Sequence, residues 1–214
     1  MQSETGTVNY TEIMQSEQDT DLFIAIKSIE GKTKTFSKEL LVDCFKFSKK
    51  VVTQKYKLME KRNQPYPKNW EFQHTIGKLQ EWSVYRLLHE YGCSEADLKI
   101  YENPTYNSDL TLGKYKLHCK SVASNSKFGK SFTFQAGFEY NDYDKTFDHG
   151  SERDIVICGT VDIKNLIVEI IDVQLWDDVK PYLKYVKGRD KSYLEGIKVF
   201  YDPLEAAKER KQKL

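Results

Sequence analysis

Apolar residues recur at every third or fourth position in two long stretches of the first half of the chain, which is the spacing of amphipathic helices. The first stretch covers residues 36–62, with Ser37 as the predicted N-terminal cap, and the closely spaced prolines of "NQPYPKN" end it. The second predicted helix runs from residue 74 to residue 91 and stops at Gly92. Before them, the polar residues 1–20 predict a loosely attached segment, and the apolar run "DLFIAIKSI" predicts a strand.

The pattern changes to short strands after the second helix. Strand-like runs are "DLKIYE", "SDLTL", "KYKLHCKSV", "SFTFQAGFEY", "DIVICGTVDI" and "LIVEIIDVQL", the last two joined by a turn near Lys164-Asn165. A short helix in "WDDVKPYLKYV", a strand in "GIKVFYD" and a terminal helix from Pro203 complete the chain. This order predicts an α/β (α+β) fold, a central mixed β-sheet flanked by helices. We expect residues 1–70 to form an N-terminal extension with a basic helix, and residues 71–214 to form the core.

Residues 107–122, "NSDLTLGKYKLHCKSV", combine a predicted hairpin with unusual chemistry. A turn at Gly113 joins a strand that begins at Asp109 to a second strand whose side chains alternate between two faces. One face carries core-like residues, namely Tyr115, Leu117 and Cys119. The other face carries polar residues, namely Lys116, His118 and Lys120. The hairpin can therefore bring the Asp109 carboxylate beside an imidazole and an ammonium group, although an ordinary solvated face could carry the same residues.

A carboxylate, a second ligand and a lysine are the groups that metal-dependent phosphodiester hydrolysis uses. Carboxylate oxygens hold Mg²⁺, the ion polarises the phosphoryl oxygen and acidifies its bound water, and an ammonium stabilises the developing charge. Glu81 lies at the edge of the apolar stripe of the second predicted helix, near Gly77, where another backbone can approach closely. Its carboxylate is a further candidate ligand for the metal or for the attacking water.

The order of these residues resembles that of the PD-(D/E)xK nuclease superfamily, the fold of many type II restriction enzymes and some homing endonucleases. Glu81 matches the helix acid, Asp109 the hairpin acid, and His118-Cys119-Lys120 the "(D/E)xK" triplet. The resemblance covers roughly residues 71–180 and extends to "SFTFQ" and "VEIIDVQLWDDVKPYL". It implies a restriction-endonuclease-like core and an Mg²⁺-dependent endonuclease activity on DNA.

His118 departs from the family pattern, because it replaces the usual acid of the triplet. The resemblance implies metal ligation by Asp109, Glu81 and the backbone carbonyl of Cys119, with His118 as a softer ligand. The histidine could shift the preference toward Mn²⁺ or leave one metal site only. Lys120 takes the catalytic lysine position. The same substitution leaves open a catalytically degenerate module that binds nucleic acid on this fold without cutting it.

Charge is unevenly distributed along a chain whose net charge is only +1. Residues 46–62 form a basic stripe, and the loop "SNSKFGKS" adds further lysines. Basic stripes of this kind bind phosphate backbones or are simply solvated helix faces. The predicted DNA-binding residues are Lys49, Lys50, Lys55, Lys127, Lys130 and Gln135. A second acidic cluster around Asp142, Asp144, Asp148 and His149 lacks calcium-loop spacing and is a weaker candidate cation site.

The remaining composition narrows the setting of the protein. No apolar run approaches the ~20 residues needed to span a membrane, and the polar N-terminus does not resemble a signal peptide. The four cysteines are scattered without metal-ligand spacing, as expected for reduced thiols in the cytoplasm. The sequence thus predicts an intracellular, phage or bacterial endonuclease that acts on DNA, expected to be double-stranded. A homodimer is expected if it cuts both strands of a palindrome, and RNA or branched substrates are not separated from duplex DNA.

Overall fold

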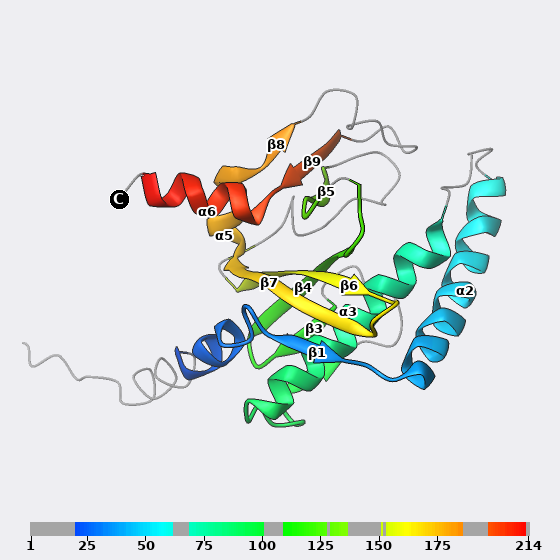
Figure 1. The fold of residues 1–214 in the computed structure, drawn as a ribbon, viewed down its shortest axis with the longest axis horizontal. Helices are drawn as coiled ribbons and strands as arrows, with labels where there is room; N and C mark the ends of the chain where they lie inside the picture. Colours follow the sequence, from blue (N-terminus) through cyan, green and yellow to red (C-terminus); the bar gives the residue numbers. More distant parts are fainter. Residues whose placement is uncertain are drawn as a thin grey trace, which may run out of the picture.

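The computed structural model describes residues 20–61, 69–100, 109–127, 129–136, 151, 153–185 and 197–212. It has a mixed α/β architecture with a six-stranded sheet and a separate three-stranded sheet, which confirms the predicted fold class (Figure 1). In the described part of the chain, no helix is both long enough and apolar enough to cross a membrane. The acidic cluster predicted between residues 142 and 149 lies outside the described residues.

The six-stranded sheet has the order β1-β7-β6-β4-β3-β2. Its strands are β1 (Thr33–Thr35), β2 (Leu98–Ile100), β3 (Leu110–Leu112), β4 (Tyr115–Ala123), β6 (Asp154–Asp162) and β7 (Ile167–Leu175). The pair β4–β6 is parallel and the other pairs are antiparallel, so the sheet is mixed as predicted. The register between β6 and β7 shifts at Cys158/Gly159, which marks a β-bulge in the centre of the sheet.

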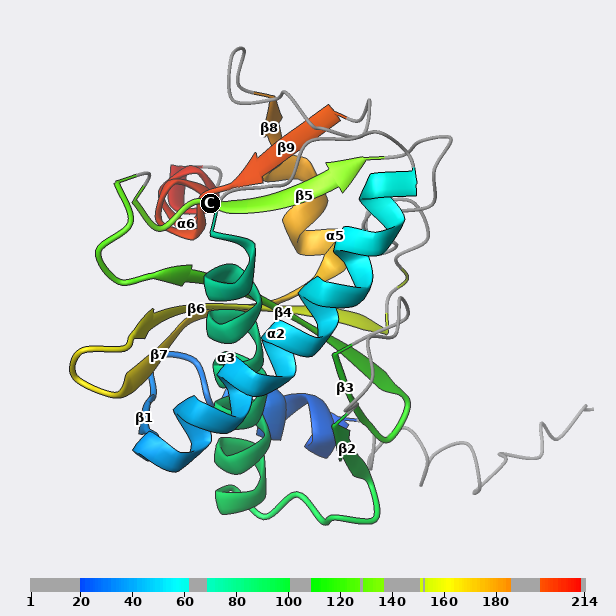
Figure 2. The same ribbon diagram turned by 90° about the vertical axis from the view of Figure 1, so that its right-hand side faces the viewer.

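Helices α2 (Lys38–Lys61) and α3 (Trp70–Glu90) run side by side, and α3 packs on β4 (Figure 2). The backbone amide of Leu40 donates to Ser37 Oγ, which confirms the predicted cap, and α3 ends before Gly92, whose φ of 90° suits glycine. Apolar residues of α2, α3 and the six-stranded sheet share one buried cluster. The strand β1 and helix α2 therefore belong to the same core as the rest of the sheet.

The opposite face of the six-stranded sheet is covered by a smaller unit. It contains β5 (Phe132–Ala136), β8 (Lys184–Tyr185) and β9 (Ile197–Tyr201) in the order β5-β9-β8, with α5 (Trp176–Val179), a 3₁₀ turn at Lys180–Tyr182 and α6 (Pro203–Gln212). Val156 and Cys158 of β6 pack into this unit, whereas the alternating residues Ile155 and Ile157 pack toward α3. The six-stranded sheet is thus buried on both faces along β6 (Figures 1 and 2).

One prediction of secondary structure and one of sheet membership are wrong. Residues 20–27 form a helix instead of a strand, because a short apolar run suits a buried helix face equally well. Ile26 and Ile29 of this region are fully buried in the α3-side cluster. The "SFTFQ" strand was expected in the central sheet, but β5 pairs with β9 in the small sheet. This second layer has consequences for the polar face of β4.

Candidate functional site

The hairpin β3–β4 places Asp109 beside the middle of β4. The turn contains Gly113 with φ of 54°, and a Cβ there would lie 2.8 Å from Leu22 Cδ1. The chain therefore requires glycine at this turn. After the turn the strands pair so that Leu110 lies opposite Leu117. Asp109 Oδ2 accepts a hydrogen bond of 2.7 Å from the backbone N–H of Cys119, as a carboxylate does when it replaces a strand carbonyl.

Glu81 extends from α3 into the same region. Its side chain is 17% exposed, and its Oε2 lies 2.6 Å from the Nζ of the buried Lys78 one helical turn away. Burial and the nearby Asp109 raise the pKa of Glu81 to about 8, against the opposing influence of Lys78. Burial, Asp109 and Glu81 likewise raise the pKa of the Cys119 thiol. The structure therefore brings together the helix acid, the hairpin acid and the middle residue of the triplet.

His118 does not join this group. It was predicted on an open polar face, but it is only 6% exposed because the face of β4 opposite α3 is covered. Its Nε2 lies 2.5 Å from Asp154 Oδ1 at the start of β6. Asp154 Oδ2 also accepts hydrogen bonds of 2.7 Å from both the backbone N–H and the hydroxyl of Ser151. Burial alone would raise the pKa of Asp154, but the hydrogen bonds from His118 and Ser151 lower it to about 2.

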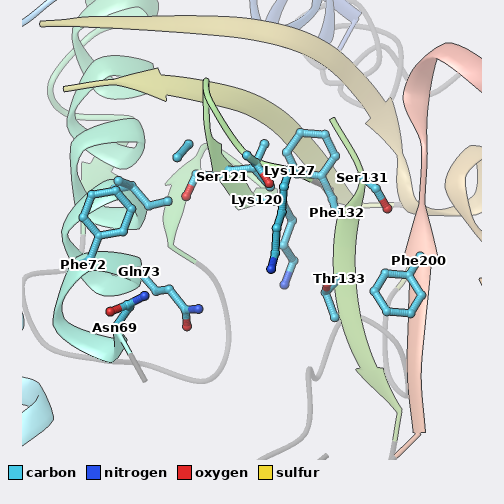
Figure 3. A pocket seen from close by; sticks show the side chains of 14 residues that line it. Asn69, Phe72, Gln73, Lys120, Ser121, Lys127, Ser131, Phe132, Thr133 and Phe200 are labelled. Atoms are coloured by element: carbon cyan, nitrogen blue, oxygen red, sulfur yellow. The ribbon is translucent and has the colours of Figure 1, made fainter. Parts of the chain in front are cut away.

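Lys120 lies on the same face of β4 as His118 but reaches a more open place. Across the sheet, the strand register aligns it with Cys158 of β6 and then with Asp172 of β7. Its ammonium lies 4.7 Å from the centroid of the Phe134 ring, within the range of a cation–π interaction. Asp172 in turn accepts hydrogen bonds from Tyr201 and Gln174. Figure 3 shows the Lys120 side chain pointing into a groove beside that of Lys127.

The groove has a volume of about 780 Å³ and lies between the first turns of α3 and the small sheet. The far half of β4 and the following loop form its third wall (Figure 3). Its lining residues are Asn69, Phe72, Gln73, Ile76, Lys120, Ser121, Val122, Ala123, Ser126, Lys127, Ser131, Phe132, Thr133 and Phe200. The volume is in the range of ligand-binding clefts, so Lys120 connects the predicted triplet with a binding surface.

The predicted metal ligands are thus divided between two faces of β4. Glu81, Asp109 and the Cys119 backbone supply hard oxygen atoms of the kind that Mg²⁺ prefers, so this part of the donor set fits the ion. His118 does not fit, because its Nε2 is engaged by Asp154 on the other face. Within the described ranges, no group of three or more His, Cys, Asp or Glu side chains is arranged to hold a metal ion.

The predicted DNA-binding residues also lie in different places. Lys49 and Lys50 are exposed on α2 and line a shallow hollow with Lys46. Lys55 lies over the Trp70 ring at 5.4 Å from its centroid. Lys127 lines the groove, whereas Lys130 lies 3.4 Å from the carboxylate of Glu169. Gln135 belongs to β5, but its side chain lies outside the described residues.

Sequence reasoning missed Asp154 and the α3 wall of the groove. Asp154 opens a strand directly after "SER", and the serine three residues before an acid was a usable signal of a local hydrogen-bonded turn. Asn69, Phe72 and Gln73 gave no comparable signal, because helix periodicity does not show which exposed turn another element approaches.

Comparisons of this chain with protein-family models, curated proteins and solved structures give no match.

Proposed function

We propose that this protein is a metal-dependent DNA endonuclease, restriction- or homing-like, that hydrolyses phosphodiester bonds. The observation that carries the proposal is that strand β4 contributes both to a pair of acids and to a lysine-lined groove. Asp109 accepts a hydrogen bond from the Cys119 backbone with Glu81 nearby on the α3 face, and the next residue along β4, Lys120, points from the opposite face into a groove that also contains Lys127. Acids and a lysine-lined groove that share one strand suit a reaction whose substrate and transition state are both anionic.

The roles of the residues follow from their positions. Asp109, Glu81 and the Cys119 carbonyl would hold Mg²⁺, or Mn²⁺, and the bound ion would supply charge stabilisation and an acidified water. Lys120 would place its ammonium against the developing charge on the phosphate, while Lys127 holds a neighbouring phosphate. The raised pKa of Glu81 supports this assignment, because a cation beside the carboxylate would favour its ionised form.

The direct test is to incubate the purified protein with plasmid and genomic DNA in Mg²⁺, in Mn²⁺ or in EDTA. We expect cleavage in at least one of the two metals and none in EDTA. Intact DNA of every form in both metals would contradict the proposal. Light scattering on the same samples would test the proposed homodimer, and fractionation of the native host cell would test a cytoplasmic location.

A catalytically degenerate DNA-binding module on the same fold is the second candidate. The 2.5 Å contact between His118 and Asp154 favours it, because the residue at the acid position of the triplet is used in a buried pair. The comparison of binding with cleavage distinguishes the two functions. A wild-type protein that binds DNA but cuts it in neither Mg²⁺ nor Mn²⁺ would identify the natural protein as a binder.

A further inference from the structure

The charge of the groove limits what can occupy it. Among its described lining residues there are two lysines and no acidic residue. The uncharged polar lining residues carry amide or hydroxyl groups, namely Asn69, Gln73, Ser121, Ser126, Ser131 and Thr133. All of these groups can donate hydrogen bonds, and the lysines lie side by side at the centre of the groove (Figure 3). The complementary ligand is therefore an anion with several acceptor atoms.

The groove also presents one exposed aromatic ring. Phe72 lies on α3 with 43% of its surface exposed, and it is among the groove-lining residues. Phe200 of β9 lies across the groove from Phe72 but is only 7% exposed, so Phe72 is the ring that a ligand can stack on (Figure 3). An exposed phenyl ring beside cationic groups has the composition of a nucleobase platform, where the ring contacts a base and the lysines contact phosphate.

The exposed Phe72 ring can distinguish single-stranded from double-stranded nucleic acid. In a duplex the base faces are stacked on one another and only their edges are open in the grooves. A phenyl ring can stack on a base only where that base has left the stack or has no complementary strand. Duplex DNA would therefore use the lysines of the groove but would leave Phe72 without a partner.

We propose that the groove is a binding site for single-stranded nucleic acid, in which Phe72 stacks on a base and Lys127 contacts the backbone. This inference rests on the proposed function and deepens it, because it makes a single-stranded segment the substrate of the Lys120 site. It replaces the duplex substrate expected from the sequence.

The test is a binding measurement in EDTA, so that it does not depend on cleavage. Fluorescence anisotropy would compare a labelled oligothymidine of roughly 12 nucleotides with a duplex of equal length at one salt concentration. We expect tighter binding of the single strand. Phe72→Ala should weaken that binding about tenfold, in the range measured for one base stacked on an aromatic residue, while Phe72→Trp should retain it.

Matched controls are available on the surface. Phe45→Ala removes a phenyl ring with 47% exposure from α2, outside the groove, and should leave oligothymidine binding unchanged. Lys127→Ala should weaken binding of both probes, whereas Lys164→Ala, in the exposed β6–β7 turn, should affect neither. Circular dichroism would verify that each variant is folded.

The outcomes separate this inference from the proposed function. Equal or weaker binding of the single strand, or unchanged binding by a folded Phe72→Ala variant, would overturn the inference even if the protein cleaves duplex DNA in Mg²⁺. A clear preference for the single strand that depends on Phe72 would support the inference even if no metal produced cleavage, and in that case the endonuclease proposal alone would fail.

Discussion

Glu81 and Asp154 are both largely removed from solvent, yet their pKa values shift in opposite directions. Glu81 lies on the α3 face of the six-stranded sheet, where burial and the neighbouring Asp109 raise its pKa to about 8. Asp154 lies on the other face, where burial opposes ionisation but hydrogen bonds from His118 and Ser151 lower its pKa to about 2. At neutral pH the carboxyl group of Glu81 is therefore mostly protonated, whereas that of Asp154 is ionised.

The difference shows that burial decides the charge of Glu81, whereas hydrogen-bond donors outweigh burial at Asp154. Asp154 has three donors and a fixed negative charge, as suits a residue that anchors the start of β6. Glu81 has the ammonium of Lys78 on one oxygen and a second carboxylate nearby. A cation placed between Glu81 and Asp109 would remove their repulsion, so the proposed chemistry belongs to the α3 face, and Asp154 gives structural support.

The largest expected effects test whether the two faces serve one reaction. Asp109→Asn removes a charged ligand from the α3 face, and Lys120→Ala removes an ammonium from the other face. Each should lower the Mg²⁺-dependent cleavage rate by at least about 100-fold, the usual cost of losing one group that stabilises a transition state. Lys116→Ala, on the exposed part of β4, is the control and should cut at the wild-type rate. Wild-type cleavage by Asp109→Asn would remove the α3 face from the site.

The next prediction concerns the stability provided by Asp154. Asp154→Ala leaves the buried His118 without its acceptor, also removes the acceptor of the exposed Ser151, and should lower the free energy of unfolding by about 3 kcal/mol. Urea denaturation measures this loss. Asp178→Ala, at an exposed position in α5, should change stability little. If Asp154→Ala is as stable as the control, the charge on this face has no structural role and the comparison with Glu81 fails.

The pH dependence of the free energy of unfolding tests the environment of Glu81. Because folding raises the pKa of Glu81, its contribution is fully present below the unfolded pKa near 4 and is lost as pH rises through about 8. Wild-type protein should therefore lose about 1 kcal/mol more than Glu81→Gln between pH 7 and pH 9, and Mg²⁺ should reduce that difference. Parallel urea titrations of the two proteins measure it. Equal pH dependence would place Glu81 in an ordinary solvated environment.

The smallest effect tests a region outside both faces. Replacing Lys49, Lys50 and Lys55 of α2 together with alanine should reduce the slope of log affinity against log salt concentration. The expected reduction is roughly 0.7 per lost contact for a single strand and 0.9 for a duplex. An unchanged slope would assign these lysines to solvent and leave the groove lysines as the basic surface that contacts nucleic acid.

Local sequence patterns predicted the helices and strands of this fold correctly more often than they predicted which of these elements pack together. The alternation in residues 114–122 placed Leu117 correctly in the core and Lys120 on the opposite face. It could not show that β5 and β9, which are distant in sequence, form a second layer near that opposite face. His118 is buried for this reason, and no sequence period carries that information. The helix at residues 20–27 was missed because an apolar run of nine residues fits both the helical period and the strand period.

The candidate site shows the same limit. Asp109 and Cys119 come from one hairpin, and their proximity follows from short-range order, whereas Glu81 was found from the order of the family motif. Asp154 is separated from His118 by 36 positions, and only the parallel pairing of β4 with β6 brings the two together. Sequence reasoning found Glu81, Asp109 and Cys119 because a family motif gives their order, and it missed Asp154, which no motif marks and which a crossover connection brings to His118.

The bulge at Gly159 limits which residues can replace this glycine during evolution. A Cβ at this position would lie 2.8 Å from the Glu169 carbonyl oxygen and 3.0 Å from Gln80 Nε2. That amide nitrogen donates to the carbonyl of Ile157, so it locks α3 to the centre of the sheet immediately beside Glu81. Any larger residue at position 159 would shift the helix that carries the candidate acid. Substitution of this glycine is therefore constrained for two reasons. A side chain would disturb the packing of α3 on the sheet, and it would shift Glu81 relative to β4.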